Sequence, residues 1–174
     1  MKKIRLSMMM IVLLIMSLAA CNSSASDQMS LDKEFEKYRA EVIEPLNDRA
    51  IKTAEMGGRY TMLLEETEEA YNYINDELIP YATETRDLAL EAQDGLVNPE
   101  IQELNEILIE NLELTLKSFA KTAAMTEMNI PPIEDEKAAY EKTEKIYAEL
   151  MELQEEIDRT SAEYEKRVDA LAEE

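Results

Sequence analysis

The chain has 174 residues, of which 39 are acidic and 18 are basic, so its formal net charge is −21. It has no histidine and a single cysteine, which excludes a Ser-His-Asp triad, a histidine-bearing zinc site, an internal disulfide and a cysteine-only metal cluster. The negative charge argues against nucleic acid as a partner, and three glycines and five prolines are too few for a β-sandwich or barrel.

Residues 1–20 have the composition of a secretory signal peptide. Three basic residues stand within the first five positions. The apolar run that follows, from residue 8 to 18, is shorter than the roughly 20 residues that a membrane-spanning helix needs. The segment ends in Leu-Ala-Ala-Cys, which resembles the lipobox of bacterial lipoproteins. That resemblance implies cleavage before Cys21 and a diacylglyceryl group on its sulfur.

The alternative for this segment is an ordinary signal peptide with a chance cysteine near its cleavage site. Because Cys21 is the only cysteine and stands where a lipobox requires one, we interpret it as a lipid attachment site. One acyl chain binds membranes marginally, whereas two chains, such as palmitate, anchor a protein stably. We therefore expect a lipid-anchored protein on the extracytoplasmic face of the cell membrane.

The rest of the chain divides into a tether and one domain. Residues 21–30 comprise the cysteine and a small, polar segment with nothing to bury, whereas 31–174 carry a helical apolar period throughout. Loss of residues 1–20 removes three basic residues and no acidic one, so the mature chain is more negative still. An acidic surface of this kind would attract a basic envelope protein or peptide.

We expect the first helix over residues 31–56, with Ser30 as its N-cap and a kink at Pro45. Gly57 and Gly58 then predict a turn, because consecutive glycines disfavour a helix interior.

The second helix is expected over residues 59–93. Apolar residues and threonines at heptad spacing predict it, namely Tyr60, Leu64, Thr67, Tyr71, Ile74, Leu78, Tyr81, Thr85, Leu88 and Ala92. Pro80 should bend this helix near Asp76, and Gly95 stands where a C-terminal cap is expected.

Asn-Pro-Glu at residues 98–100 combines an N-cap, a favoured N1 proline and an acid at the positive end of the helix dipole. It predicts a third helix from Pro99 to about residue 128. Several sides of that helix are apolar, so we expect it to be the most buried. Two prolines at 131–132 end it, and the last helix extends over the remainder of the chain.

These elements predict an all-α fold, an antiparallel up-down bundle of four long helices joined by short loops. A single helix over residues 31–94 would extend roughly 96 Å and leave much of its apolar face uncovered. The alternative is a three-helix bundle with a kinked N-terminal segment.

The sequence offers no catalytic constellation, and we expect no catalytic residue, no cofactor and no metal site. The acidic runs at 65–69 and 155–158 fall between the apolar positions and read as solvated faces, and Asp94-Gly95 lacks the other ligands of a calcium loop. Tyr73 and Tyr140 are out of phase with the apolar stripes, so we expect them on the surface as markers of a contact patch. Three apolar residues of the third helix either cover the first helix or form a contact surface: Ile109, Leu114 and Leu116.

The lipobox, the tether and the stretch PYATETRDLALEAQDGLVNPEIQELNEILIENLELTLKSFAK, followed by a long Glu/Lys-rich helix, resemble small all-helical cell-surface lipoproteins of Gram-positive bacteria. Some of those are called cell-wall-binding lipoproteins. The resemblance implies an extracytoplasmic helical bundle and carries over no functional residue other than Cys21.

Our leading hypothesis is therefore a non-catalytic binding or structural module at the cell surface. Its partners would be the membrane, through the lipid anchor, and a basic envelope protein or peptide. The alternative is a small-ligand sensor or carrier with a pocket between helices near Pro80, lined by Tyr71, Ile74 and Leu78. An enzyme ranks third, because only carboxylates and tyrosines could act.

Overall fold

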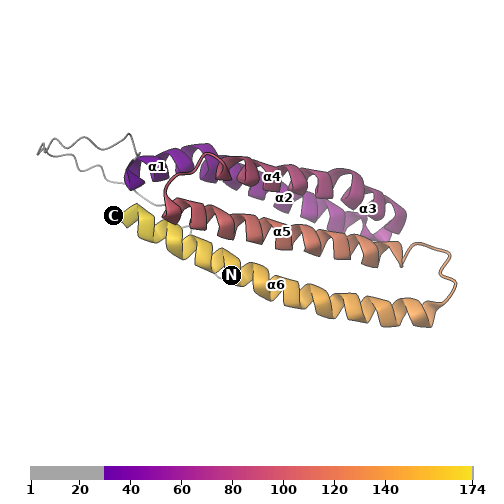
Figure 1. Ribbon diagram of the computed structural model, residues 1–174. Helices are drawn as coiled ribbons and strands as arrows, with labels where there is room; N and C mark the ends of the chain where they lie inside the picture. Colours follow the sequence, from indigo (N-terminus) through magenta and orange to yellow (C-terminus); the bar gives the residue numbers. More distant parts are fainter. Residues whose placement is uncertain (1–29, 174) are drawn as a thin grey trace, which may run out of the picture.

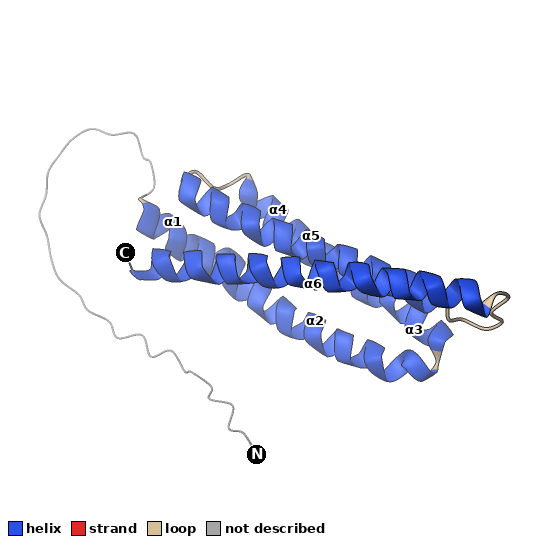
Figure 2. Cartoon of the chain, turned by 90° about the horizontal axis from the view of Figure 1, so that it is seen from below, coloured by secondary structure: helices blue, strands red, loops and turns tan. Residues whose placement is uncertain are grey.

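A computed structural model describes residues 30–173, and within that range the chain is all-α and contains no β-strand. Four antiparallel rods form the bundle that the sequence predicts (Figures 1 and 2). The first rod joins α1 (Leu31–Tyr38), η1 (Arg39–Ile43), α2 (Glu44–Met62) and η2 (Leu63–Glu65). The second joins α3 (Thr67–Tyr73), η3 (Ile74–Leu78) and α4 (Ile79–Gln93), and the others are α5 (Pro99–Glu127) and α6 (Glu136–Glu173).

The first turn of the bundle does not lie at Gly57-Gly58. Helix α2 continues through both glycines to Met62, and the chain turns over residues 63–66. Neither glycine has a positive φ, and a Cβ at either position would meet nothing within 4 Å. The prediction of a turn here was wrong, because the burial of Met56 and the bond of Tyr60 to Thr126 hold α2 against its neighbours and override a weak helix propensity.

Two prolines produce the same local irregularity. A π-helical turn precedes each of them: η1 ends two residues before Pro45, and η3 ends two residues before Pro80. In these turns the N–H of Glu44 bonds the carbonyl of Arg39, and the N–H of Ile79 bonds that of Ile74, five residues back. Each proline then stands at the start of a new α-helix, where its missing N–H is not needed. The kinks expected from the sequence are thus π turns.

Helix α5 is the centre of the bundle, as its many apolar sides predict. It begins where expected: the Asn98 side chain accepts a hydrogen bond of 3.1 Å from the N–H of Glu100, and Pro99 opens the helix. Figure 1 shows α5 between α6 and the helices of the first two rods, and its backbone lies close to α1, α3, α4 and α6. Of the long helices, α4 and α6 pack on α5 most extensively, whereas α2 lies against α3, η3 and α4.

The apolar core forms two separate clusters. The proximal cluster, near the start of α1, buries Phe35, Tyr38, Val42, Leu46, Ala89, Ile101 and Leu104. The distal cluster, near the turn between α2 and α3, buries Met56, Tyr73, Ile74, Leu78 and Ala123.

A buried carboxylate ties the first helix to the start of the third rod. Glu34 lies in the first turn of α1, and its side chain is buried. Its oxygens accept hydrogen bonds from the backbone N–H groups of Val97, at 2.6 Å, and Asn98, at 3.1 Å. The expected N-cap beside it is only partly formed, because the Ser30 side chain makes no capping bond.

The stripe predicted for the second helix is confirmed in part, because Ile74, Leu78 and Thr85 are buried. Leu64 and Leu88 were expected in the core, yet 45% and 41% of their surface is exposed. Tyr73 was expected on the surface but is 6% exposed, with the guanidinium of Arg59 over its ring at 4.7 Å. The turn over residues 63–66 and the π turn η3 shift the helical phase, which a constant heptad cannot anticipate.

The position of the glycines predicts a gain in stability. Gly57→Ala or Gly58→Ala should raise the free energy of unfolding by about 0.5–1 kcal/mol, because alanine favours a helix interior and the space is open. Urea unfolding of the chain from Asn22 onward measures this. A loss of stability in both variants would show instead that the chain turns at the glycines.

Candidate functional site

The bundle is unclosed along one side, between α2 and α6. The extensive backbone contacts of α6 are with α5, whereas α2 lies against α3, η3 and α4. No comparable contact joins α2 to α6 in residues 30–173. The space between α2 and α6 is therefore filled by side chains alone. At two positions along the bundle these side chains leave a hollow.

One of these spaces, here called the central hollow, lies between the two core clusters. Its volume is about 360 Å³, and all four rods line it. The lining residues are Ile43, Leu46, Asn47, Ala50, Thr53, Ala82, Thr85, Leu108, Asn111, Leu112, Thr115, Ser161, Tyr164 and Glu165.

The hollow exists because every rod contributes small side chains at the same level. Thr53 of α2, Thr85 of α4 and Thr115 of α5 occupy apolar-stripe positions that the sequence assigns to the core. Ala50 and Ala82 stand beside them on their helices. A packed core at this level would need side chains of larger volume, so the hollow is a property of the sequence.

The polar groups around the hollow are already satisfied. Each threonine hydroxyl donates to the carbonyl four residues back on its own helix, at 2.8–3.0 Å. Arg49 donates from Nε to the Thr85 hydroxyl at 2.8 Å, while its guanidinium stacks on the Tyr81 ring at 4.2 Å. In the part of the chain that the structure describes, no buried side-chain polar atom lacks a partner. What the hollow offers to a ligand is mainly apolar surface.

One acidic residue lines the central hollow, and the guanidinium of Arg49 lies against its lining residue Thr85. Glu165 is the one charged residue among those that line it. Tyr164 also lines it, and its hydroxyl lies 3.5 Å from that of buried Tyr38. Burial raises the pKa of both tyrosines, so these hydroxyls stay neutral at physiological pH.

A second space, here called the distal hollow, lies on the same side near the far end of the bundle. Its volume is also about 360 Å³, and it is lined by Tyr60, Leu64, Thr67, Met125, Thr126, Asn129 and Thr143. These residues come from the end of the first rod, the start of α3, the end of α5 and the start of α6. We name the two hollows and the side that joins them the α2–α6 groove.

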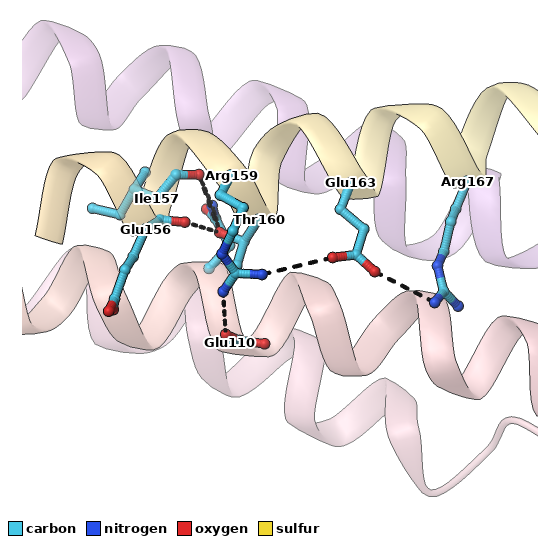
Figure 3. A network of polar contacts seen from close by, with 8 residues as sticks. Glu110, Glu156, Ile157, Arg159, Thr160, Glu163 and Arg167 are labelled. Atoms are coloured by element: carbon cyan, nitrogen blue, oxygen red, sulfur yellow. Dashed lines mark hydrogen bonds and ion pairs between the residues drawn. The ribbon is translucent and has the colours of Figure 1, made fainter. Parts of the chain in front are cut away.

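The α6 wall of the groove is fixed to α5 by one partly buried amide, that of Asn111, and by surface charges. The Asn111 amide nitrogen lies 2.7 Å from the hydroxyl of buried Thr160 and 3.0 Å from the carbonyl of Ile157. Figure 3 shows the surface ladder beside it, in which Arg159 bridges to α5. Its ion pairs are Arg159–Glu110 at 3.3 Å, Arg159–Glu163 at 3.8 Å, Arg167–Glu163 at 3.4 Å and Arg167–Glu103 at 2.9 Å.

The residues that the sequence analysis named as candidate sites have different outcomes in the structure. Cys21 lies outside the described residues, so its lipidation stays a prediction. The lining expected for a pocket near Pro80 was wrong, because Ile74 and Leu78 are packed in the distal cluster. The central hollow is lined instead by Ala82 and Thr85, which follow Pro80 on α4. Tyr140 is exposed, as expected, and Leu114 is buried.

The acidic runs at 65–69 and 155–158 present exposed carboxylates, as their spacing predicts. Asn111 and Arg49 were not recognised in the sequence, because an isolated polar residue in a helix gives no sign of which neighbour it faces.

No match was found for this chain among protein-family models, curated proteins or solved structures. Within residues 30–173, no three His, Cys, Asp or Glu side chains gather closely enough to hold a metal ion. The helices described are also too polar or too short for any of them to cross a bilayer. The α2–α6 groove is thus the feature from which a function can be argued.

The hydrogen bonds of Asn111 and the exposed ion pairs between α5 and α6 should contribute unequally to the free energy of unfolding. Asn111→Ala should lower the free energy of unfolding by about 1–3 kcal/mol, because it leaves buried Thr160 without its donor. Arg159→Ala or Arg167→Ala should each cost less than about 1 kcal/mol, since exposed ion pairs contribute little and are screened by salt. Urea unfolding at low and high salt compares them, and a larger loss in the arginine variants would contradict this ranking.

Proposed function

We propose that the protein is a lipid-anchored, extracytoplasmic binding module that holds its partner in the α2–α6 groove without catalysing a reaction. The observation that carries this proposal is the central hollow, to which all four rods contribute and which ordinary core residues would fill. A module with a purely structural role has no use for a half-open apolar hollow in the middle of its core. Binding therefore accounts for the groove better than support alone.

A small-ligand carrier is the second candidate, and the same hollow favours it. A volume of about 360 Å³ falls at the lower end of the range of about 300–1,000 Å³ for ligand pockets. The hollow is half open, and its lining offers few unsatisfied polar groups that could orient a small polar molecule. An apolar group inserted from outside fits these features.

The arrangement of the ends suits attachment at Cys21. Leu31 and the end of α6 lie at the same end of the bundle, and the turn over 63–66 and the α5–α6 loop lie at the other (Figure 1). Helix α6, with 38 residues, spans about 57 Å at 1.5 Å per residue. An anchor preceding Leu31 would hold the proximal cluster near the bilayer and present the distal hollow away from it.

Lipid attachment predicts a simple outcome for Cys21→Ser. The wild-type protein should partition with membranes and into the detergent phase, whereas the variant should be released, because it has no thiol to acylate. Ser23→Ala is the matched control and should stay with the membrane. Membrane fractionation and mass spectrometry measure this, and a membrane-bound Cys21→Ser protein would contradict the anchor.

A large side chain in the central hollow should block ligand binding there. Ala50→Phe places a ring in the groove wall and should weaken binding of the neutral dye N-phenyl-1-naphthylamine by about tenfold, since the ring occupies apolar volume. Ala148→Phe, on an exposed part of α6, is the control. Fluorescence titration of the chain from Asn22 onward measures both. Equal dye binding by the two variants would show that the groove is not the binding surface.

A further inference from the structure

Large apolar side chains lie exposed along both walls of the α2–α6 groove. Ile51 of the α2 wall is 62% exposed, and Tyr147 and Met151 of the α6 wall are 60% and 49% exposed. Leu64 lines the distal hollow and is also exposed. Isolated exposed apolar residues are ordinary, but a set that borders one groove marks an interaction surface.

The helical register places these residues on the groove side. Ile51 follows the lining residue Asn47 by four positions, which is about one turn. Tyr147 precedes the lining residue Ser161 by two heptads, and Met151 precedes Glu165 by two heptads. The exposed residues therefore extend the hollows along the groove.

The two walls differ in charge. On α6, the heptad line that contains Met151 and Glu165 also contains Asp158 and Glu144, and all three carboxylates are exposed. On α2, the lining residues include the small, uncharged Asn47, Ala50 and Thr53, with the exposed Ile51 beside them. An occupant that matches both walls has an apolar face with basic residues along one edge.

We propose that the α2–α6 groove binds an amphipathic helix of a partner protein, with a bulky apolar side chain in the central hollow and Lys or Arg residues against Asp158 and Glu165. This inference rests on the proposed function and names its partner class. The helix would close the side on which α2 and α6 are not in extensive contact, as a fifth helix of the bundle. The small side chains of the α2 wall allow its backbone to approach closely.

Charge selects this occupant over a second copy of the chain. A copy presents the same acidic α6 wall, and the net charge of −21 makes two copies repel. A small molecule could fill the central hollow but would leave the exposed side chains of Ile51, Tyr147 and Met151 uncovered. A basic amphipathic helix covers both features.

The test uses a labelled synthetic peptide of leucine and lysine, about 18 residues or five helical turns long, with its leucines on one face. Fluorescence anisotropy measures its binding to the chain from Asn22 onward. One control peptide has the same composition in scrambled order and lacks an apolar face, and another carries glutamate in place of lysine. We expect the amphipathic basic peptide to bind, and both controls to bind at least about tenfold more weakly.

Matched variants locate the site. Tyr147→Ala with Met151→Ala should raise the dissociation constant of the peptide by about tenfold, because these side chains form the apolar wall. Leu88→Ala with Leu90→Ala removes similar exposed area from α4 and should change the constant by less than about twofold. All four positions are exposed, so the fold should tolerate the changes.

Charge variants separate docking from general attraction. Asp158→Asn with Glu165→Gln should weaken the peptide more than Glu152→Gln with Glu156→Gln, which removes equal charge from other exposed positions of α6. Equal losses in the two pairs, or equal binding of the scrambled peptide, would overturn the inference. A dimer in sedimentation equilibrium that the Tyr147→Ala, Met151→Ala variant abolishes would overturn it in favour of a second copy.

The dye and the peptide separate the two proposals. Dye binding that Ala50→Phe blocks, with no binding of the amphipathic peptide, overturns the helix but leaves the groove as a small-ligand site. If neither probe responds to groove variants, the proposed function fails with the inference.

Discussion

The packing of apolar side chains around α5 is the constraint on which the rest of the structure depends. Ile101 and Leu104 are fully buried in the proximal cluster, and Ala123 and Thr126 are buried at the other end of the same helix. The backbone of α5 lies close to α6, α4, α3 and α1, whereas α2 lies against α3, η3 and α4 and, among the described residues, not extensively against α5 or α6. The α2–α6 groove is the side that the other three rods leave open.

The candidate site arises because the side chains at one level of the bundle are small, and not because reactive groups gather there. Each of the four rods contributes at least one alanine, serine, threonine or asparagine to the lining of the central hollow, whereas the clusters on either side contain Phe35, Tyr38, Met56 and Tyr73. The two packed clusters fix the distance between the helices. The helices therefore keep the same distance at the level between the clusters, where the side chains are too small to fill the space. An apolar hollow can thus persist in a small bundle without collapsing, because the cavity walls belong to helices that are packed elsewhere.

Much of the fold could be predicted, because helix starts and apolar periods are local signals. The start at Asn98 and Pro99, the central place of α5 and the four antiparallel rods all follow from spacing. The turn and Tyr73 could not be placed, since tertiary contacts carried α2 through two glycines and shifted the phase of α3. The candidate site was harder to predict from the sequence than the fold. Thr53, Thr85 and Thr115 stand at positions that the apolar spacing assigns to the core, and a hollow forms only because the fold places them at the same level of the bundle. Polar clamps such as Arg49 and Asn111 depend on which helices are neighbours, and periodicity does not contain that information.

The contact of Glu34 with the loop before α5 has a mechanical consequence. In a chain tethered ahead of Leu31, any pull from the bilayer enters through α1, which by itself is two turns long. The hydrogen bonds of the Glu34 carboxylate would transmit that load to the backbone of Val97 and Asn98, and so to α5. Helix α1 would then not be pulled away from the bundle one turn at a time. In such a tethered chain, the hydrogen bonds across the base of the bundle would bear the tension in shear.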